Sequence, residues 1–473
     1  MTHELDQILI SSSQPDFKKR LDGFLNSKFG LSHFGMGAPH IKNRQKVEEI
    51  LDKVDKDEVV AEYTETFDKV KLTPGQFRIP KEDLEKAHKE LKKNNPILLV
   101  SIQQAIENVR KYQEAIYIGN SKHLGIKYTL IKWIGICFKL LGIKYTPIKR
   151  VGICFKHTGI KYTPIKRIGI CVPGASAPLP STVIMTAVPA QVAGVKEIVI
   201  VSPPRYNGSI HPVTLAVCHE LGVDEVYRVG GAQAVAALTF GTKKIKQVDK
   251  IVGPGNQWVQ TAKQLVFGTV GIDSIAGPSE VLIIANEKAN PAWVAADMLS
   301  QAEHAPGSSL LFTDSQRLAE NVLGELKKQV EQLDRAKETI ECLKEYGGIA
   351  VFKTIDDVVY EANDFAAEHL QIQCGEQSKK VASLIRNAGA IFIGDYSPVA
   401  VGDYWAGPSH TLPTGLSAMF SSALTSNDFV KSTSIIEYDK EKLAESAEDI
   451  IRLAEVEGLD AHAKSIRIRQ KDL

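Results

Sequence analysis

The segments EIVIVSPP at residues 197–204 and HPVTLAVCHELG at residues 211–222 decide the fold class of this chain. The first is a short run rich in Val and Ile that ends in proline, which is typical of a strand buried on both faces. The second has the length and apolar spacing of a helix. A buried strand followed by a helix predicts a parallel sheet covered by helices.

The same alternation continues from residue 168 onward. Further apolar runs, each ended by turn or polar residues, are KIVGPGN at 250–256, EVLIIAN at 280–286, SSLLFTD at 308–314, GIAVFK at 348–353 and GAIFIGD at 389–395. Helix-like segments such as PAWVAADMLSQAEH at 291–304 separate them. This number of strands favours two parallel α/β sheets, whose ligands usually bind in loops beyond the carboxyl ends of the strands.

The bulk composition favours an enzyme that acts on a small molecule. Lys and Arg total 57 and Asp and Glu total 56, so the formal net charge is +1. This balance gives no electrostatic reason to expect nucleic acid or an anionic membrane as a partner. Because 473 residues exceed what one hydrophobic core usually supports, we expect at least two folding units.

The cysteines and the N-terminus favour a cytoplasmic protein. The N-terminus is acidic where a signal peptide would be basic. The longest uncharged run, 168–195, contains four prolines, so we interpret it as strand, loop and helix and not as a membrane span. The six cysteines are too few and too scattered for a disulfide framework: Cys137, Cys154, Cys171, Cys218, Cys342 and Cys374.

A 17-residue unit occurs three times after a charged, helix-like arm that reaches about residue 115. GIKYTLIKWIGIC begins at residue 125, GIKYTPIKRVGIC at residue 142 and GIKYTPIKRIGIC at residue 159. Stacked copies could form a small solenoid, although three short copies are marginal for one. The simpler interpretation is an in-frame duplication. In that case the third copy, which leads into VPGASAPLP, keeps its structural place and the first two form an inserted excursion.

Three glycine-rich turns follow predicted strands: GGAQ at 230–233, GPGN at 253–256 and AGPSE at 276–280. Glycine lets the backbone approach a ligand closely, and each turn presents an amide or hydroxyl at its tip. None contains the GxGxxG fingerprint, and each taken alone is equally typical of an ordinary tight turn.

Four segments carry side chains that bind metals or transfer protons. Gln301 and His304 fall on one face at the end of a predicted helix, where an amide oxygen and an imidazole could bind zinc. Glu368 and His369 are adjacent, also on a predicted helix, and suit proton transfer near neutral pH. GDYWAGPSH at 402–410 and EGLDAH at 457–462 each add a carboxylate and an imidazole. Taken singly, each segment could equally be a capping or surface pair.

In combination and in order, these motifs resemble the histidinol dehydrogenase family. The resemblance runs from about residue 168 to the C-terminus, with looser similarity in the preceding arm. It implies an oxidoreductase that converts L-histidinol to L-histidine through L-histidinal with reduction of two NAD, the last steps of histidine biosynthesis. The motifs that carry it are VPGASAPLPSTV, GGAQAVAALTFGT, GPGNQWVQTAK, GIDSIAGPSEV, DMLSQAEH, AEHL, VGDYWAGPSHTLPTG and EGLDAH.

The resemblance implies one Zn2+ in each active site. Two imidazoles, one carboxylate and one amide oxygen suit this borderline cation. Zinc has no redox chemistry, so the hydride must go to NAD. The implied zinc ligands are Gln301, His304, Asp403 and His462. The implied substrate contacts are these four ligands together with Ser279, His369, His410 and Glu457.

The resemblance also implies the catalytic and cofactor residues. His369 would take the alcohol proton as the first hydride leaves, and Glu368 would activate water for the second oxidation. NAD contacts map to Gln233, Asn256 and Cys171. Family members carry a tyrosine that touches NAD at the position of Cys171, so we expect binding there to be altered but not lost.

The family architecture implies two Rossmann-like parallel-sheet domains with a helical N-terminal arm and a helical C-terminal tail. The expected limits are 1–45 for the arm, 46–167 with 281–424 for the first α/β domain, 168–280 for the second, NAD-binding domain and 425–473 for the tail. The triplicated segment at 125–175 begins in the first domain. The tail is expected to reach across a homodimer and to complete the partner's site with Glu457 and His462.

Two other functions are open at this point. A paralogous zinc- and NAD-dependent dehydrogenase could act on another alcohol, since function resides in the site and not in the fold. His410 and Glu457, the groups expected to bind the histidinol imidazole and amine, argue against it. A catalytically silent member could serve as a zinc-binding structural or interaction protein. The intact set of ligands and acid/base residues argues against that function.

Overall fold

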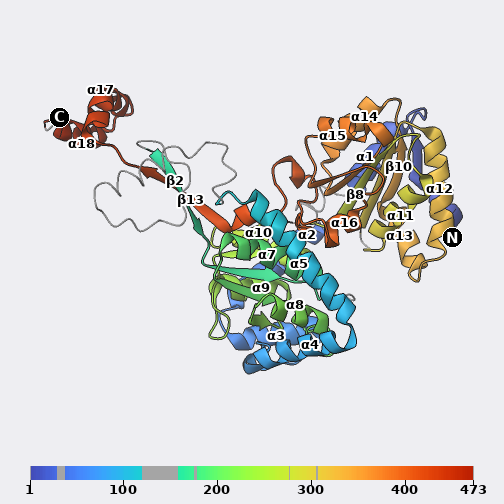
Figure 1. Ribbon diagram of the computed structural model, residues 1–473, viewed down its shortest axis with the longest axis horizontal. Coiled ribbons are helices and arrows are strands. Elements are labelled where there is room, and N and C mark those ends of the chain that lie inside the picture. Colours follow the sequence, from blue (N-terminus) through green and yellow to red (C-terminus); the bar gives the residue numbers. More distant parts are fainter. Residues whose placement is uncertain are drawn as a thin grey trace. The chain divides into compact units, whose positions relative to one another are not determined.

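The computed structural model describes residues 2–28, 38–119, 158–174, 178–275, 277–304 and 307–471 of the chain. The chain divides into two compact units, which can be followed in Figure 1. The larger contains Met1–Glu114 and Ile165–Phe429, and the smaller contains Ala115–Pro164 and Val430–Leu473. The first two copies of the repeat lie outside the described residues, so their interpretation as an inserted excursion stays a prediction.

The larger unit contains a six-stranded sheet in which all strands are parallel. Helices cover both of its faces (Figure 1). The strand order is β1 (Leu9–Ser11), β10 (Gly347–Val351), β9 (Gly307–Thr313), β8 (Ser279–Ala285), β11 (His369–Gln373) and β12 (Ala390–Ile393). One face packs on α11 (Pro291–Ala302), α12 (Gln316–Val330) and α13 (Ala336–Tyr346). The other packs on α1 (Phe17–Lys28), α14 (Ile355–Phe365) and α15 (Ser378–Leu384).

Strand β8 shows why the sequence folds this way. Val281 and Ile283 enter the core on the α11 side, whereas Leu282 and Ile284 enter the core on the α14 side. Successive side chains of a strand point to opposite faces, so a strand buried on both faces must be continuously apolar. The uninterrupted run 281–285 meets that requirement and confirms the predicted strand.

The larger unit also contains a five-stranded parallel sheet. Its order is β5 (Glu225–Tyr227), β4 (Glu197–Val201), β3 (Arg167–Cys171), β6 (Lys250–Val252) and β7 (Gly271–Ile272). The connecting helices are α7 (Pro180–Ala193), α8 (Pro212–Glu220), α9 (Gly231–Phe240) and α10 (Gln257–Val266). From β3 the chain builds first to one side and then returns to the other. In doubly wound sheets such a reversal opens a crevice at the carboxyl ends of the central strands.

Four of the described helices that precede residue 120 lie on the side of the five-stranded sheet. They are α2 (Ala38–Lys53), α3 (Asp57–Asp68), α4 (Lys81–Asn94) and α5 (Pro96–Ile116). Helix α2 packs on α9 and α10, α3 packs on α9, and α4 packs on α8. The sequence grouped residues 46–167 with the six-stranded sheet, because apolar spacing identifies a helix face but not the sheet that covers it. The packing groups α2, α3 and α4 with the five-stranded sheet instead. The predicted domain limits stay a prediction.

The N-terminal arm and the smaller unit complete the described chain. Residues 9–11 of the arm form β1, the edge strand of the six-stranded sheet. In the smaller unit β2 (Thr158–Pro164) pairs with β13 (Val430–Ile436) in antiparallel orientation. The third repeat copy therefore contributes to β2 and, in the larger unit, to β3. Helices α17 (Lys440–Val456) and α18 (Asp460–Gln470) pack on each other through a small apolar cluster, as expected for a helical tail.

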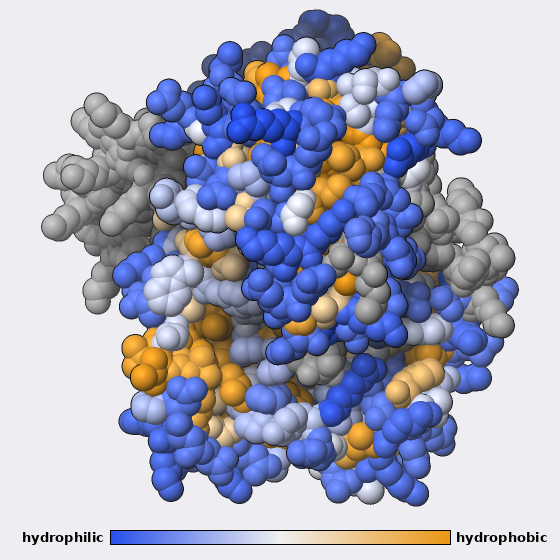
Figure 2. Space-filling view, turned by 90° about the vertical axis from the view of Figure 1, so that its right-hand side faces the viewer, coloured by the Kyte–Doolittle hydropathy of each residue, from blue (hydrophilic) through white to orange (hydrophobic). Residues whose placement is uncertain are grey.

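The surface is largely polar on the side shown in Figure 2, where apolar residues gather in separate groups. Within the described part of the chain, each helix is too short or too polar to cross a membrane. The uncharged run 168–195 forms β3 and α7, with residues 175–177 outside the described part. This outcome confirms its interpretation as strand, loop and helix.

Candidate active site

Glu368 is held in a buried acid/base cluster at the amino ends of β8 and β11. Its carboxylate Oε2 accepts hydrogen bonds from the Ser279 hydroxyl at 2.8 Å and from the Glu280 backbone N–H at 2.7 Å. Glu368 is 6% exposed. Ser279 and Glu280 open β8, and Glu368 immediately precedes β11, so the parallel pairing of these strands brings the groups together. Two donors on one carboxylate oxygen fix its orientation.

His369 is the second member of this cluster, and its ring orientation is fixed by the backbone. Its Nδ1 lies 2.9 Å from the Glu280 carbonyl oxygen. A carbonyl oxygen only accepts, so Nδ1 carries a hydrogen and Nε2 is the nitrogen left to accept a proton. Nε2 lies 3.5 Å from Asp403 Oδ1, and within the described residues it has no hydrogen-bond partner.

The charge state of His369 follows from its neighbours. Burial lowers the pKa of the imidazole, but the carboxylates of Glu368 and Asp403 outweigh burial, and the pKa lies well above its usual value. Burial raises the pKa of Asp403. The nearby His369, and to a lesser extent His410 and His304, lower it by more, so the pKa of Asp403 lies below its usual value. The cluster is therefore an electrostatically coupled group of carboxylates and imidazoles.

The sequence placed Glu368 and His369 on a helix, and the structure corrects this. Helix α14 ends at Phe365, Ala366 adopts a left-handed conformation with φ 46°, and His369 begins a strand. On a strand, neighbouring side chains point to opposite faces. The main chain of Glu280 reaches both residues, because its N–H bonds to Glu368 and its carbonyl bonds to His369.

The predicted ligands Gln301 and His304 lie beside each other. Helix α11 ends at Ala302, so His304 lies just beyond the helix, and its N–H bonds to the Gln301 carbonyl oxygen at 3.2 Å. A Cβ on Gly307 would lie 3.1 Å from Gln301 Nε2 and 3.2 Å from His304 Cβ, so both side chains lie against this glycine. Gln301 is 3% exposed, and its Nε2 has no partner in the described part of the chain.

These residues provide a donor set that fits a zinc ion. The set consists of the buried amide of Gln301, the imidazole of His304 and the carboxylate of Asp403, which offer N and O ligand atoms with a single negative charge. His462 lies on α18 in the smaller unit, where it is exposed, and the structure relates it only to that unit. Over the described ranges, no group of three or more His, Cys, Asp or Glu is assembled for a metal.

His410 lies in the loop that follows α16 (Val399–Tyr404), and contacts with helices of the five-stranded sheet hold this loop. Ser409 Oγ donates to the Met185 carbonyl oxygen in α7 at 2.9 Å, and Asn108 Nδ2 in α5 donates to the Trp405 carbonyl oxygen at 3.0 Å. Burial lowers the pKa of His410 despite the nearby Asp403 carboxylate. His410 is therefore a neutral imidazole that can accept or donate a hydrogen bond.

Glu280 is a buried carboxyl group that sequence reasoning missed. It is 1% exposed, and its Oε1 accepts from the Gly415 N–H at 2.6 Å. Burial, reinforced by the Glu368 carboxylate, raises the pKa of Glu280 well above its usual value. The available signal was a glutamate at the first position of an apolar run, directly after Ser279.

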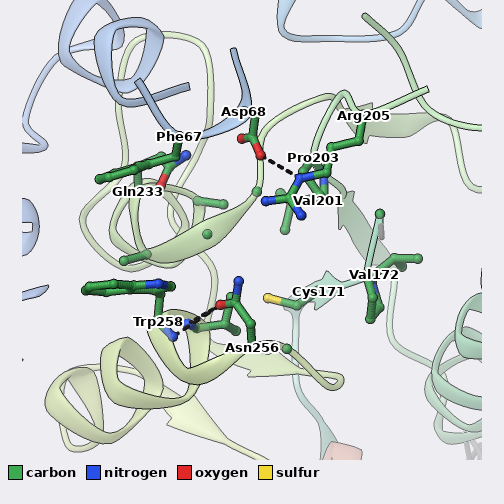
Figure 3. Close-up of a pocket in the computed structure, with 18 of the residues that line it drawn as sticks. Phe67, Asp68, Cys171, Val172, Val201, Pro203, Arg205, Gln233, Asn256 and Trp258 are labelled. Carbon is green, nitrogen blue, oxygen red and sulfur yellow. Dashed lines mark hydrogen bonds and ion pairs between the residues drawn. The ribbon is translucent and has the colours of Figure 1, made fainter. Parts of the chain in front are cut away.

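A separate pocket opens at the carboxyl ends of β3, β4, β5 and β6, and Figure 3 shows its lining. The cavity has a volume of about 270 Å3, and all three predicted cofactor residues, Cys171, Gln233 and Asn256, line it. Gln233 is fully buried, and neither polar atom of its amide has a partner in the described part of the chain. Asn256 Oδ1 caps α10 by accepting from Trp258 N and Val259 N.

Cys171 ends β3, and its sulfur points into this pocket (Figure 3). Burial raises the pKa of the thiol to about 12, so the group is neutral. It therefore acts as a small apolar wall and not as a nucleophile.

A buried ion pair holds the pocket turn at Gly253, and sequence reasoning missed it. Lys263 Nζ donates to the Asp273 carboxylate and, at 3.1 Å, to the Gly253 carbonyl oxygen. Asp273 Oδ2 accepts from the Gly253 N–H at 2.7 Å. Gly253 has φ 101°, and a Cβ there would lie 2.4 Å from the Cys171 carbonyl oxygen, so only glycine fits. Lys263 was hidden because it lies within an otherwise ordinary amphipathic helix.

The predicted site residues thus fall in four groups. Ser279, Glu368 and His369 form one cluster with Asp403 nearby, and Gln301 with His304 lies beside Gly307. Cys171, Gln233 and Asn256 line the pocket of the five-stranded sheet. Glu457 and His462 are exposed in the smaller unit. Their roles as site residues stay predictions.

Two doubly wound sheets, one with a buried acid/base cluster and one with a glycine-lined pocket, define an α/β enzyme. Comparison with known proteins identifies its family. The family model described as histidinol dehydrogenase matches residues 38–470, so the chain belongs to the histidinol dehydrogenase family.

Relatives and a solved structure agree with this membership. The histidinol dehydrogenase of Oceanobacillus iheyensis is 44% identical over 446 residues, covering 91% of this chain and 95% of the relative. That of Rhodopirellula baltica is 43% identical over 419 residues, covering 87% and 83%. The crystal structure of histidinol dehydrogenase from Elizabethkingia anophelis matches with a TM-score of 0.78 and 32% identity, covering 90% of this chain and 92% of that chain.

Proposed function

We propose that the protein oxidises L-histidinol to L-histidine through L-histidinal, with reduction of two NAD per substrate and one Zn2+ in each active site. One substrate, one water and two NAD+ give one carboxylate, two NADH and three protons. The observation that carries the proposal is the buried pair Glu368 and His369, held by Ser279 and by the main chain of Glu280. Family membership supports this substrate over another alcohol.

His369 is proposed as the base that accepts the alcohol proton. The hydrogen bond from Nδ1 to the Glu280 carbonyl leaves Nε2 as the accepting atom, on the side of Asp403. The base must be neutral to act, whereas the surrounding carboxylates favour the imidazolium. Neutralisation of Asp403 by a cation would weaken that effect, so cation binding and base strength are coupled at this site.

Glu368 is proposed to activate water for the second oxidation. Its carboxylate is oriented by Ser279 and Glu280, so it is positioned to take a proton from a water molecule without reorganisation. His410 and Asp403 lie close together, because each contributes to the shift in the pKa of the other. They are proposed to orient the imidazole and amine of the substrate.

Zinc is proposed to bind Gln301, His304 and Asp403 of one subunit and His462 from the tail. When bound, it would supply Lewis acidity and anchor the nitrogen atoms of the substrate. The positions of the side chains support this, because Gln301 is buried beside His304, and His304 lies close enough to Asp403 for the two to interact electrostatically.

NAD is proposed to bind the pocket that Cys171, Gln233 and Asn256 line. Helices α9 and α10 both begin at the pocket, and helix N-termini stabilise phosphate groups. Gly230 cannot carry a side chain, because a Cβ would lie 2.6 Å from Pro203 Cβ, so the backbone is free to approach a ligand. The unpaired amide of Gln233 gives a hydrogen-bonding group inside the cavity.

We further propose a cytoplasmic homodimer in which the tail, with Glu457 and His462, completes the partner's site. The exposure of both residues in the smaller unit leaves them accessible to a second copy. His462→Ala and Glu457→Gln should each lower activity, and mixing either with an Asp403→Asn variant should restore part of it by forming one intact site. Failure of mixed, re-associated subunits to recover activity would argue against sharing.

The substrate can be tested with purified protein, NAD and metal analysis. L-Histidinol should give NADH formation, with one zinc per subunit, and zinc removal by a chelator should abolish activity until zinc is restored. Ethanol and an amino alcohol without the imidazole should give little NADH. Equal activity with these alcohols would contradict the proposed substrate, and full activity without a divalent metal would contradict the zinc site.

A further inference from the structure

We propose that the ion pair between Asp68 and Arg205 makes the pocket select NAD over NADP. The inference rests on the proposed function, because it requires the cofactor to bind in this pocket. Arg205 Nε donates to Asp68 Oδ1 at 2.9 Å (Figure 3). Both residues line the cavity together with Cys171, Gln233 and Asn256.

The two partners are unequally buried. The Asp68 side chain is 3% exposed, whereas that of Arg205 is 46% exposed. Asp68 is the last residue of α3, and Lys69 ends that helix in a left-handed conformation. The other end of α3 is also fixed, because Asp57 Oδ1 accepts from the Lys244 N–H. The carboxylate is therefore held in the pocket wall by a helix attached at both ends.

The charge of the pocket depends on this pair. Among the described residues that line the cavity, Arg205 is the one Lys or Arg and Asp68 the one Asp or Glu. The positive charge that could bind a phosphate is thus neutralised in place. The phosphates common to NAD and NADP can use the N-termini of α9 and α10, but the additional 2′-phosphate of NADP would find no free cation among the described residues that line the cavity.

The structure favours exclusion of NADP by charge over exclusion of NADP by shape. A second cavity of about 140 Å3 adjoins the first and shares Pro173, Gly174, Pro203 and Arg205 as lining residues. It is lined by polar groups including Ser209 and His211, and burial lowers the pKa of His211, so this ring supplies no charge near neutral pH. A phosphate beside Arg205 would have room, but it would also face the Asp68 carboxylate. In other dinucleotide sites an acidic residue hydrogen-bonds the ribose hydroxyl of NAD, whereas an Arg accommodates the 2′-phosphate of NADP.

The test compares kcat/KM for NAD and NADP, and Kd for each from the quenching of protein fluorescence, with L-histidinol as substrate. Wild type should prefer NAD. Asp68→Asn keeps the side-chain shape, removes the carboxylate charge and frees Arg205, and it should shift the preference toward NADP by about tenfold or more. Asp68→Asn combined with Arg205→Gln should lose that shift, because the cation is gone.

Two further variants give independent outcomes. Arg205→Gln alone leaves the Asp68 carboxylate unpaired and should move the preference further toward NAD, which tests the idea even if Asp68→Asn fails to fold. Asp224→Asn removes the carboxylate of an exposed ion pair with Lys81 on the same unit and should leave the preference unchanged.

The results separate the two proposals. If Gln233→Ala weakens NAD binding but Asp68→Asn leaves the NAD to NADP ratio at its wild-type value, the specificity inference is wrong and the pocket assignment stands. If Gln233→Ala and Asp68→Asn both leave NAD binding unchanged, the pocket is not the cofactor site and both fail. If Arg205→Gln weakens NAD and NADP equally, Arg205 binds a phosphate common to both, and selection by the pair is overturned.

Discussion

The two parallel sheets of the larger unit use opposite edges. The six-stranded sheet gathers Glu368 and His369 at the amino ends of β8 and β11, whereas the five-stranded sheet opens its pocket at the carboxyl ends of β3 and β6. Both sheets reverse their winding direction at a central strand, which usually creates a crevice at the carboxyl edge. The topology is therefore shared, but the acid/base cluster and the pocket lie at opposite edges of their sheets.

The loops explain the difference. The loops after β3 and β6 contain Gly174 and Gly253, where the close backbone packing excludes a Cβ, and the cavity opens beside these loops. After β8 and β11 the loops contact each other, because Asn286 Nδ2 donates to the Cys374 carbonyl oxygen at 3.3 Å and Gly375 packs against Lys288. The carboxyl edge of the six-stranded sheet is thus occupied by its own loops. The strand order creates a crevice at the carboxyl edge, and the loop residues determine whether that crevice is open or filled.

The largest expected effect comes from removal of His369, the proposed base on the six-stranded sheet. His369→Ala should lower kcat by about 10²- to 10⁴-fold, the usual contribution of a general base. Zinc content and NAD binding should be retained, because His369 is not one of the proposed zinc ligands and the cofactor pocket lies on the other sheet. Loss of zinc from this variant would mean that His369 is a ligand and not the base.

The next effect breaks the ion pair beneath the pocket of the five-stranded sheet. Lys263→Met leaves Asp273 buried without its partner and should lower the free energy of unfolding by about 3 to 5 kcal/mol. KM for NAD should rise more than KM for L-histidinol, because Gly253 loses its support. Denaturant unfolding and steady-state kinetics measure these changes. An equal rise in both KM values would show that the pocket and the acid/base cluster are not independent.

A smaller effect concerns Glu280 and pH. Its pKa is raised in the folded protein, so its contribution to stability is present below the unfolded value of about 4.3 and is lost as pH rises through the folded value. Glu280→Gln keeps an acceptor for the Gly415 N–H and cannot ionise. The unfolding free energy of Glu280→Gln relative to wild type should therefore increase from pH 5 to pH 8. A constant difference across that range would contradict the account.

The smallest effect restores an aromatic ring to the pocket. The thiol of Cys171 points into the cavity (Figure 3). Cys171→Tyr introduces there the tyrosine that the family resemblance implies at this position. A ring contact of the usual strength should lower KM for NAD about two- to tenfold with little change in kcat. Initial rates at varied NAD concentration measure it. A higher KM would show that the surrounding pocket has adapted to the smaller side chain.

The strands could be predicted because local composition determines them. Runs such as 280–286 and 308–314 are apolar on both faces and bounded by turn residues, and they form β8 and β9 within one residue of the predicted limits. The shorter β5 and β7 have little apolar signal of their own and are strands because of the neighbours they pair with.

The site could be predicted only where its chemistry is local. The adjacent Glu368 and His369 could be predicted as a proton-transfer pair from their side chains alone, although a helix was expected where β11 begins. Glu280, Lys263 and Asp68 gain their importance from partners on other elements, namely Gly415, Asp273 and Arg205. Charged residues are usually exposed, so a single sequence gives no reason to place these three in buried contacts.

The most direct measurement of the central claim counts NADH for each L-histidinol consumed by the purified, zinc-loaded protein. Two NADH per substrate, with L-histidine as the product, are predicted for a site that completes both oxidations. One NADH per substrate, with release of the aldehyde, would contradict the account.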